Sequence, residues 1–456
     1  MKIYDLVVIG AGPAGEVGAI RAAQCGMKVA LIEKRAHLGG TCLNVGCIPT
    51  KALVESARVW SKLKDIEKEG FDIGTPAYDW QRIMDKKQGV VDAQRKGLRF
   101  LMKKNKIDVF EGAASFLDSK TIQVGEETLK AEKTLIATGS KVRELPFAIS
   151  TGKHILTSDS ILSLDHVPEK MAVIGGGVVG LEFASIFARF GSAVDVLEMG
   201  EQVIPSEDEE CAKELVRQLK KQGVQIKTGV QVEAVREHDT GCELKLKDGE
   251  TSQYNKVLVS IGREPVTEEL NLKKIGVHTE RGFIPVDRSY RTTCSGVFAV
   301  GDVIATPALA HTASSEALHA VEVMAGHQPK CINYDTNPSA VYTYPEVASV
   351  GRTEKQLVEL GVEYKKTQFP FAPMAKAKID GATVGFIKIL SEPVHGELLG
   401  VHIVGTKATE MISEFVLGKV LETTLEEIGQ AIHPHPTLSE TIQEAAHAGL
   451  GGAIHL

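Results

Sequence analysis

The chain of 456 residues has few aromatic side chains and few cysteines, and it lacks long runs of one charge. Aromatic residues make up 5% of the sequence, and there are seven cysteines. So small and odd a number in a long chain disfavours the disulfide framework of a secreted protein. The 52 basic residues are outnumbered by 59 acidic ones, and no extended basic cluster suited to nucleic acid is present. We therefore expect a cytoplasmic protein that binds no nucleic acid.

Two apolar segments imitate membrane signals only in part. Residues 1–23 resemble a signal peptide loosely, and residues 171–188 approach the length of a transmembrane helix. Asp5 and Pro13 interrupt the first segment, and Glu182 lies within the second. We predict neither export nor a membrane span. The length instead indicates about three globular domains, at roughly 100–200 residues each.

Glycine, in contrast, is plentiful, and part of it belongs to an internal repeat. There are 44 glycines, and residues 8–33 align without a gap with residues 173–198. Five special positions coincide in the two copies, which indicates a duplicated unit. These positions are Gly10, Gly12, Gly15, Gly26 and Glu33 in the first copy, and Gly175, Gly177, Gly180, Gly191 and Glu198 in the second.

Each copy has the order expected of a Rossmann-like nucleotide-binding unit. In the first copy, an apolar strand at Ile3–Ile9 precedes the G-x-G-x-x-G turn. A helix from about Ala14 to Cys25 and a second strand at Lys28–Ile32 follow. The glycines permit a tight turn, approach of a pyrophosphate and close helix packing, while the helix N-terminus favours phosphate. Because the closing acid can accept hydrogen bonds from a ribose, two such units predict two bound dinucleotides.

Glu198, the acid that ends the second copy, also predicts which nicotinamide cofactor binds. A 2′-phosphate needs a cation near this strand end. After Glu198 no lysine or arginine appears until Lys213. The sequence therefore favours NAD over NADP.

Two cysteines follow the first unit with the spacing C-x4-C. Cys42 and Cys47 lack the C-x2-C spacing and the second ligand pair that zinc sites usually show, so we expect no metal. Gly40, Gly46 and Pro49 favour a bent helix start that could bring the sulfurs together, and a helix N-terminus favours the reactive thiolate. The pair is either a redox-active dithiol or two inert buried thiols.

The segment GGTCLNVGCIPTK at residues 39–51, between GAGPAG and GGGVVG, resembles the pyridine nucleotide-disulfide oxidoreductases. The resemblance extends over about residues 3–445. It implies an α/β fold with two Rossmann-like dinucleotide-binding domains and a C-terminal α+β dimerisation domain. The FAD-binding domain would comprise residues 1–144 and 265–335, the NAD-binding domain 145–264, and the dimerisation domain 336–456. Further matching segments are Ala137–Gly139, Gly296–Asp302, Tyr342–Glu346 and His433–Glu440.

The resemblance assigns roles to individual residues. Cys47 would face the flavin, Cys42 would exchange with a dithiol substrate, and Lys51 would lie near the flavin and pair with Glu182. The expected FAD-binding residues are Gly10, Gly12, Gly15, Glu33, Lys51, Ala114, Thr138, Gly139, Ser140, Asp302, Ala310 and His311. The expected NAD-binding residues are Gly175, Gly177, Gly180, Glu182, Glu198, Val232 and Gly262.

A histidine near the C-terminus is the expected catalytic base, which would take a proton from a substrate thiol. His435 precedes Pro-Thr-Leu-Ser-Glu440, and a histidine is suited to take a thiol proton near neutral pH. Glu440 could hold its tautomer, and His433 is a second candidate. In the family the base reaches the disulfide of the other subunit, so the resemblance implies a homodimer.

The implied reaction is the reoxidation of protein-bound dihydrolipoyl groups by NAD⁺ through a Cys42–Cys47 disulfide. The implied partners are the lipoyl domains of 2-oxo acid dehydrogenase or glycine cleavage complexes. Another disulfide reductase, a diaphorase and a non-catalytic nucleotide-binding subunit are the alternatives. The intact cysteine pair and the His435–Glu440 pair favour an enzyme. The tail AHAGLGGAIHL has no cysteine pair, which disfavours a relative of mercuric reductase. Pro434 and the segment Thr312–Ser315 depart from the family pattern.

Overall fold

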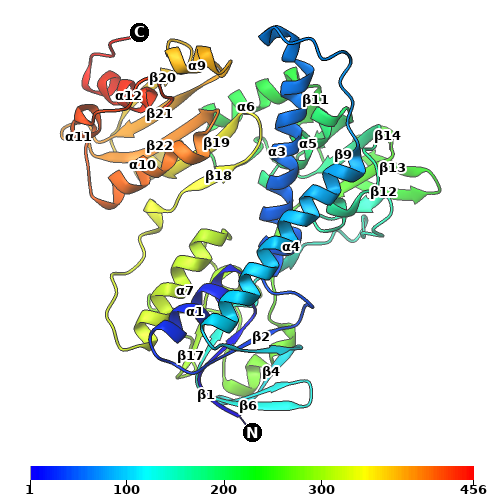
Figure 1. The fold of residues 1–456 in the computed structure, drawn as a ribbon, viewed down its shortest axis with the longest axis vertical. Coiled ribbons are helices and arrows are strands. Elements are labelled where there is room, and N and C mark those ends of the chain that lie inside the picture. Colours follow the sequence, from blue (N-terminus) through cyan, green and yellow to red (C-terminus); the bar gives the residue numbers. More distant parts are fainter. Residues whose placement is uncertain (1) are drawn as a thin grey trace.

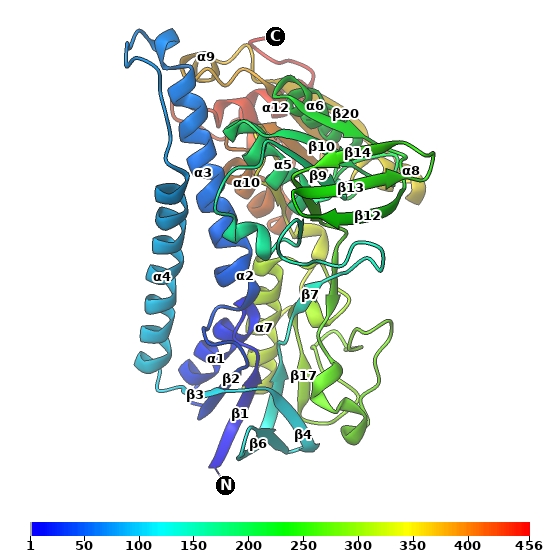
Figure 2. The same cartoon turned by 90° about the vertical axis from the view of Figure 1, so that its right-hand side faces the viewer.

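The computed structural model describes residues 2–456. The first nucleotide-binding unit and its sheet occupy one end of the molecule, and the second unit and the C-terminal domain lie toward the other end (Figures 1 and 2). The long helices α3 (Cys47–Lys64) and α4 (Trp80–Lys104) run between the two ends. Residues 65–79 connect the two helices.

The first sheet has seven strands in the order β3-β2-β1-β6-β5-β4, with β17 also paired to β6. Strands β3, β2, β1, β6 and β17 are parallel, while β4 and β5 form an antiparallel extension. Helices α1 and α7 pack against each other on this sheet. The bounds of the strands and helices of this unit are β1 (Lys2–Ile9), α1 (Pro13–Gln24), β2 (Val29–Glu33), β3 (Asp108–Glu111), β4 (Ala114–Asp118), β5 (Thr121–Val124), β6 (Glu127–Ile136), β17 (Val297–Ala299) and α7 (Ala310–Met324).

The second sheet repeats the parallel arrangement with five strands in the order β11-β10-β9-β15-β8. A three-stranded antiparallel sheet, β12-β13-β14, accompanies it. The bounds are β8 (Ile155–Leu156), β9 (Lys170–Ile174), α5 (Val178–Phe190), β10 (Ala193–Leu197), α6 (Glu209–Lys221), β11 (Val224–Lys227), β12 (Val232–His238), β13 (Gly241–Leu246), β14 (Thr251–Tyr254) and β15 (Lys256–Val259). The strands β7 (Ser140–Val142) and β16 (Arg263–Pro265) pair with each other where the chain passes between the two units.

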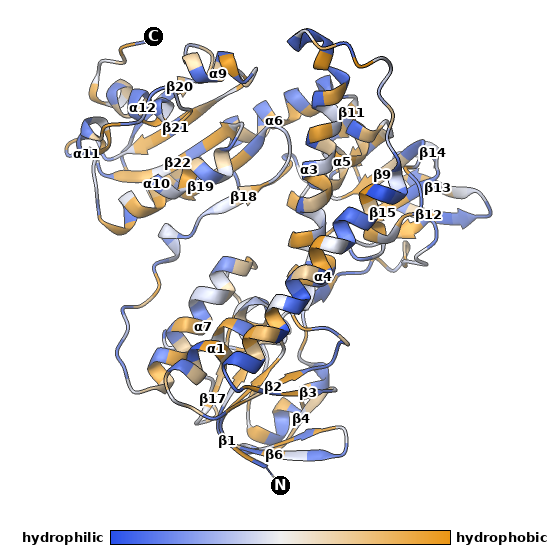
Figure 3. Ribbon diagram, in the orientation of Figure 1, coloured by the Kyte–Doolittle hydropathy of each residue, from blue (hydrophilic) through white to orange (hydrophobic). Residues whose placement is uncertain are grey.

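The C-terminal domain is built on an antiparallel sheet of order β18-β19-β22-β21-β20. Apolar residues of its strands, such as Ile387 and Ile403, are fully buried, and strands β21 and β22 are mostly orange, the colour of hydrophobic residues, in Figure 3. Lys388, also fully buried, joins this sheet to the second unit through an ion pair with Asp208 at 2.8 Å. The bounds are β18 (Ser339–Val341), β19 (Glu346–Gly351), α8 (Glu354–Leu360), β20 (Lys365–Pro370), α9 (Ala375–Ile379), β21 (Gly385–Ser391), β22 (Leu398–Gly405), α10 (Ala408–Val420), α11 (Leu425–Gln430) and α12 (Glu440–Leu450).

The structure confirms the expected fold class and the order of elements in both copies of the repeat. The first helix runs from Pro13 to Gln24 and the following strand ends at Glu33, within one or two residues of the prediction. Proline at the start of this helix is favourable because its missing N–H would have no helical partner there. Within residues 2–456, no helix is both long and apolar enough to span a membrane.

Candidate active site

A cavity of about 1020 Å³ lies between the first sheet, the segment that carries the two cysteines, and the second unit. Among residues 2–456, its lining contains every expected FAD-binding residue except Gly15. Gly15 packs against the turn itself, because a Cβ there would lie 1.8 Å from the carbonyl oxygen of Gly10. The expected flavin residues from the N-terminal region, from Thr138–Ser140 and from Asp302–His311 are thus brought to one cavity.

One part of this cavity fits a dinucleotide. Gly10 has a φ of +100°, and a Cβ on it would lie 2.3 Å from the carbonyl oxygen of Ala137. The Glu33 carboxylate is buried and accepts hydrogen bonds from the N–H groups of Ala11 and Arg35, each at 2.9 Å. No side chain of the described residues caps the N-terminus of α1, so its N–H groups remain available to a phosphate. The volume is at the upper end of small-molecule sites, as a group of the size of FAD requires.

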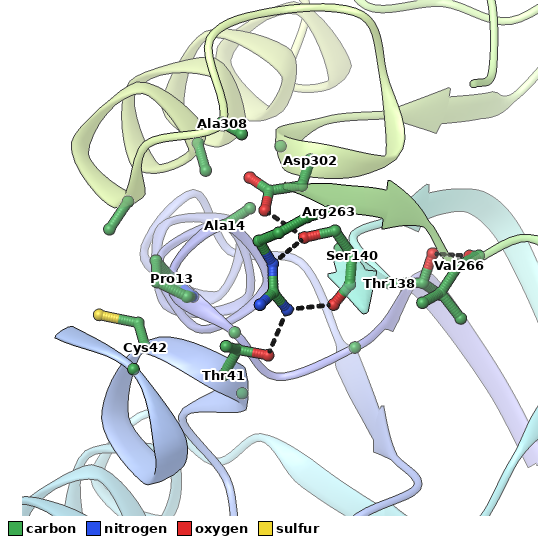
Figure 4. Close-up of a pocket in the computed structure, with 18 of the residues that line it drawn as sticks. Pro13, Ala14, Thr41, Cys42, Thr138, Ser140, Arg263, Val266, Asp302 and Ala308 are labelled. Carbon is green, nitrogen blue, oxygen red and sulfur yellow. Dashed lines mark hydrogen bonds between the residues drawn. The ribbon is translucent and has the colours of Figure 1, made fainter. Parts of the chain in front are cut away.

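A hydrogen-bonded network around Arg263 forms another wall of the cavity (Figure 4). The Nε atom of Arg263 donates to Ser140 Oγ at 2.7 Å, and Nη2 donates to the Ser140 carbonyl oxygen at 2.8 Å. Ser140 Oγ in turn donates to Asp302 at 2.6 Å. Sequence reasoning predicted Ser140 and Asp302 but missed Arg263, although it directly follows Gly262. A guanidinium in this position can balance the charge of a pyrophosphate.

Cys42 and Cys47 both line the cavity, on two consecutive helices. Cys42 lies in α2 (Gly40–Val45), and Cys47 is the first residue of α3. Gly46 separates the helices with φ −140° and ψ −117°, and a Cβ on it would lie 2.9 Å from the carbonyl oxygen of Thr41. The predicted bend is therefore present, and it brings the two free thiols close enough for each to shift the pKa of the other.

The two thiols have opposite electrostatic environments. The hydrogen bond from Cys42 lowers the pKa of Cys47 to about 7, with help from the charge of Lys51 and against the effect of burial. The hydrogen bond with Cys47, burial, and the charges of Cys47 and Glu16 raise the pKa of Cys42 well above its ordinary value. Cys47 is therefore the sulfur that carries a thiolate near neutral pH, which is the reactive form.

Lys51 and Glu182 form the expected ion pair across the two nucleotide-binding units. Lys51 Nζ lies 2.9 and 2.8 Å from the two carboxylate oxygens of Glu182. Burial lowers the pKa of Lys51, but the charge and hydrogen bonds of Glu182 outweigh it and hold the pKa above its ordinary value. Although Glu182 belongs to α5 of the second unit, it lines the cavity beside Lys51.

Tyr342, which sequence reasoning did not assign to the site, completes this group. Its ring lies 4.6 Å from Lys51 Nζ, and its backbone N–H donates to Glu182 at 3.0 Å. Tyr342 directly follows β18, so the C-terminal domain also contributes to the cavity. Its segment, Tyr342–Glu346, was recognised in the sequence only as one that matches the family.

The second unit repeats the geometry of the first. Gly175 has a φ of +106°, and the Glu198 carboxylate accepts hydrogen bonds from the N–H groups of Gly176 and Gly200, each at 2.6 Å. A Cβ built on Gly177 or Gly262 would have no described atom within 4 Å, so both face open space. Gly180, like Gly15, packs against its turn, because a Cβ on it would lie 2.2 Å from the Gly175 carbonyl oxygen. Val232 begins β12. This arrangement leaves room for a second dinucleotide.

His435 and Glu440 form a pair in the C-terminal domain. His435 Nδ1 lies 2.8 Å from Glu440 Oε1, and Glu440 Oε2 accepts a hydrogen bond from the N–H of Thr437 at 2.7 Å. The His435 side chain is 73% exposed, whereas that of His433 is 5% exposed and bound to Glu414. Neither His435 nor Glu440 is among the described residues that line the cavity with the cysteines. A single chain therefore holds the dithiol and the histidine pair separately.

Comparison with known proteins identifies the family. The family model of the pyridine nucleotide-disulphide oxidoreductases matches residues 4–317, and that of their dimerisation domain matches residues 337–446. The chain is 43% identical to a dihydrolipoyl dehydrogenase of Bacillus subtilis, with 99% of each chain covered. It is 42% identical to a dihydrolipoamide dehydrogenase of Chaetomium thermophilum, with 99% of this chain and 92% of the relative covered.

Solved structures agree with this result. LpdA of Mycobacterium tuberculosis matches with a TM-score of 0.92 and 26% identity, covering 98% of this chain and 99% of LpdA. The HOCl-induced flavoprotein disulfide reductase RclA of Escherichia coli matches with a TM-score of 0.88 and 28% identity, covering 97% and 99%. The chain belongs to the pyridine nucleotide-disulphide oxidoreductase family of enzymes.

Proposed function

We propose that the protein is an FAD-dependent dihydrolipoyl dehydrogenase, which transfers two electrons from a dihydrolipoyl group to NAD⁺. The observation that carries the proposal is the Cys42–Cys47 pair beside Lys51 in the wall of a cavity of dinucleotide size. Relatives of this name that are more than 40% identical over nearly the whole chain support the same substrate. Bound FAD would supply the carrier that passes two electrons from the dithiol pair to the nicotinamide.

The residues of the chain account for the thiol chemistry. His435 takes the proton of one substrate thiol, and the resulting thiolate attacks Cys42 of the Cys42–Cys47 disulfide. The disulfide breaks, and Cys47 leaves as a thiolate beside the Lys51 ammonium and at the N-terminus of α3. The second substrate thiol then attacks the mixed disulfide, so that the lipoyl disulfide forms and Cys42 leaves with a proton. Two electrons now reside on the enzyme, and one proton each on His435 and Cys42.

Two chains are required to bring these groups together in the proposed dimer. His435 is exposed, and Ile432, three residues earlier, is 97% exposed. Leu417 and Val420 on α10 and the adjacent Leu421 are also exposed apolar residues of the same domain. Contact between two such domains would bury these side chains, and we propose that each active site receives His435 from one chain and its cysteines from the other.

The dinucleotides are assigned by what surrounds each unit. The first unit opens into the cavity with the cysteines, so it would hold FAD, whereas the second would hold NAD⁺. The Glu198 carboxylate, oriented by two backbone N–H groups, suits the ribose hydroxyls of NAD⁺ and repels the 2′-phosphate of NADP⁺. Partner molecules would be the lipoyl domains of 2-oxo acid dehydrogenase or glycine cleavage complexes in the cytoplasm.

Direct assay of the flavin-loaded enzyme tests the proposal. Oxidation of dihydrolipoamide by NAD⁺, with one FAD per chain and a much lower kcat/KM for NADP⁺, is the expected result. A lipoyl domain carrying a reduced lipoyl group should serve as substrate as well. Reduction of other disulfides by NADH, with no measurable turnover of dihydrolipoamide, would assign the protein to the general disulfide reductases instead.

A complementation experiment tests the shared active site. His435→Gln should lower dihydrolipoamide turnover by about 10²–10⁴-fold, because a positioned general base contributes that much. Transfer from NADH to an artificial acceptor should change little, since it does not need this base. Mixed dimers of His435→Gln with Cys47→Ser should recover part of the activity, because one of their two sites keeps both groups. A verified mixed dimer without recovery contradicts the shared site.

A further inference from the structure

Tyr342 contacts both members of the Lys51–Glu182 pair, although it belongs to a different domain from either of them. Lys51 Nζ lies over the Tyr342 ring, 4.6 Å from its centre, and the backbone N–H of Tyr342 donates to Glu182 Oε1 at 3.0 Å. The Lys51 ammonium therefore contacts a carboxylate and the face of an aromatic ring at the same time. Both kinds of contact favour a cation at this place.

The strand that precedes Tyr342 is fixed to the second unit by a buried carboxylate. Glu207, between β10 and α6, is 3% exposed and accepts hydrogen bonds from Ser339 Oγ at 2.6 Å and from Ser349 Oγ at 2.7 Å. Ser339 and Ser349 are direct partners in the pairing of β18 with β19. One side chain of the second unit thus holds both strands at the point where β18 begins.

The residues that follow Tyr342 are fixed to the same unit. The carbonyl oxygen of Tyr344 accepts a hydrogen bond from Gln222 Nε2 at 2.7 Å, and the guanidinium of Arg189 lies 4.2 Å from the centre of the Tyr344 ring. Arg189 Nε also donates to Gln222 Oε1 at 3.3 Å. Residues of the second unit therefore hold the chain on both sides of Tyr342, three residues before it and two residues after it.

Lys51 lies one helical turn after Cys47 on the same face of α3, and both line the cavity. The positive charge near Cys47 depends on where the ammonium is held, because the lysine side chain is long and flexible. The titratable groups that act on Lys51 are Cys47 of its own helix, Glu182 from α5 and Tyr342. Cys47 is also affected by Cys42 from α2.

We propose that Tyr342 is a positioning residue, whose ring and backbone N–H hold the Lys51 ammonium and the Glu182 carboxylate where they stabilise a thiolate on Cys47. The ring face and the N–H make these contacts, and the hydroxyl group does not. The C-terminal domain thereby completes a polar group whose other members come from the two nucleotide-binding units. The inference goes beyond the proposed function, because it requires only that Cys47 form a thiolate, whatever disulfide the enzyme acts on.

Alkylation of the reduced holoenzyme tests this inference without any turnover. The enzyme is reduced with dithiothreitol, freed of it by anaerobic gel filtration and treated with iodoacetamide at several pH values, and modified Cys47 is measured by peptide mass spectrometry. Tyr342→Leu removes the ring and keeps the backbone N–H. The midpoint of Cys47 alkylation, at about 7 in the parent, should rise by about half a pH unit, since a cation–π contact contributes about two- to five-fold. Less thiolate is then present at pH 7.

The reactivity of the Lys51 amine provides a second readout. Brief acetylation of the holoenzyme with acetic anhydride modifies amines, and Lys355, whose side chain is 84% exposed, serves as the internal reference. The ratio of Lys51 to Lys355 modification should increase by about two- to five-fold in Tyr342→Leu, because an ammonium that loses its contact with the ring is deprotonated more easily.

Three further variants make the result specific. Tyr342→Phe keeps both the ring and the N–H, so it should retain the parent midpoint of Cys47 alkylation. Tyr342→Met lacks the ring and should show the same rise as Tyr342→Leu, which guards against a leucine variant that does not fold. Tyr364→Leu removes a tyrosine of the same domain that donates to Glu354 at 2.9 Å outside the cavity lining, and it should change neither readout.

The possible outcomes separate this inference from the proposed function. An unchanged midpoint in folded, flavin-containing Tyr342→Leu or Tyr342→Met overturns the role of Tyr342. An equal rise in Tyr342→Phe or in Tyr364→Leu also overturns it, because the effect would then come from the hydroxyl group or from a general loosening of the domain. A rise that is confined to the variants without a ring, in an enzyme that does not oxidise dihydrolipoamide, supports the role of Tyr342 and rejects the proposed substrate.

Discussion

The two copies of the nucleotide-binding unit have the same local geometry and different surroundings. In both copies the first glycine adopts a positive φ. The acid at the end of the second strand, Glu33 or Glu198, accepts hydrogen bonds from two backbone N–H groups. The segment after Glu33 carries Gly40, Cys42 and Cys47 back across the first turn, whereas the residues after Glu198 lead to α6. The comparison teaches that the repeat supplies a dinucleotide site and that the segment packed against it supplies the chemistry.

The helices of the two copies carry an acid at different positions, which are adjacent in the alignment. Glu16 of α1 aligns with Leu181 of α5, and Val17 aligns with Glu182. Of these two acids, Glu182 lines the cavity with the two cysteines and pairs with Lys51. The duplicated scaffold has become asymmetric by single substitutions on its helices.

The largest effect should come from removing the two cysteines that follow the first copy and have no counterpart after the second. Cys47→Ser or Cys42→Ser should lower dihydrolipoamide turnover by at least about 10⁴-fold, as for other nucleophiles, with flavin retained. Cys25→Ser, at the end of α1, is the matched control and should remain active. Substantial dithiol turnover in both active-site variants would show that the two copies differ in some other respect.

Gly12 and Gly177 are the glycines proposed to face a pyrophosphate in each copy, and substituting them should affect the two cofactors differently. In Gly12→Ala the new Cβ has its nearest neighbour at 3.9 Å, and in Gly177→Ala it meets no described atom within 4 Å, so both variants should fold. The methyl group should instead obstruct the phosphates. Gly12→Ala should lose FAD, whereas Gly177→Ala should keep it and show a KM for NAD⁺ raised by about ten-fold or more, one lost contact of about 1.4 kcal/mol. Flavin content and steady-state kinetics measure both results.

Glu198 should determine the choice of nicotinamide cofactor with a smaller effect. Glu198→Gln removes the charge that repels a 2′-phosphate, so the ratio of kcat/KM for NAD⁺ to that for NADP⁺ should fall by about ten-fold. Glu33→Gln in the first copy serves as the control and should leave this ratio unchanged. Equal use of both cofactors by the parent enzyme would contradict the assignment.

The smallest effect should be a shift in the titration of Cys47. Its pKa of about 7 means that the thiolate forms as the pH rises through 7. Lys51→Met should raise this midpoint by about one unit, because the cation that favours the thiolate is lost. At pH 7 the variant should therefore contain less thiolate than the parent, as measured by the rate of Cys47 alkylation. A midpoint that does not move would show that Lys51 does not contribute to the lowered pKa of Cys47.

Local sequence determined much of this protein. The glycine spacing requires positive φ at Gly10 and Gly175, and a strand, a turn, a helix and a strand follow in order, so both units could be predicted from short-range chemistry. The bend at Gly46 and the His435–Glu440 pair were also accessible, because their residues are near in sequence. Each of these features depends on contacts within a few tens of residues.

Only the tertiary structure decided which distant residues meet. Arg263 joins Ser140 and Asp302 because β16 pairs with β7, and Tyr342 reaches Lys51 because the third domain packs beside the second unit. No periodicity or spacing signals these contacts. They form because the packing of whole domains brings together residues that lie far apart in the sequence.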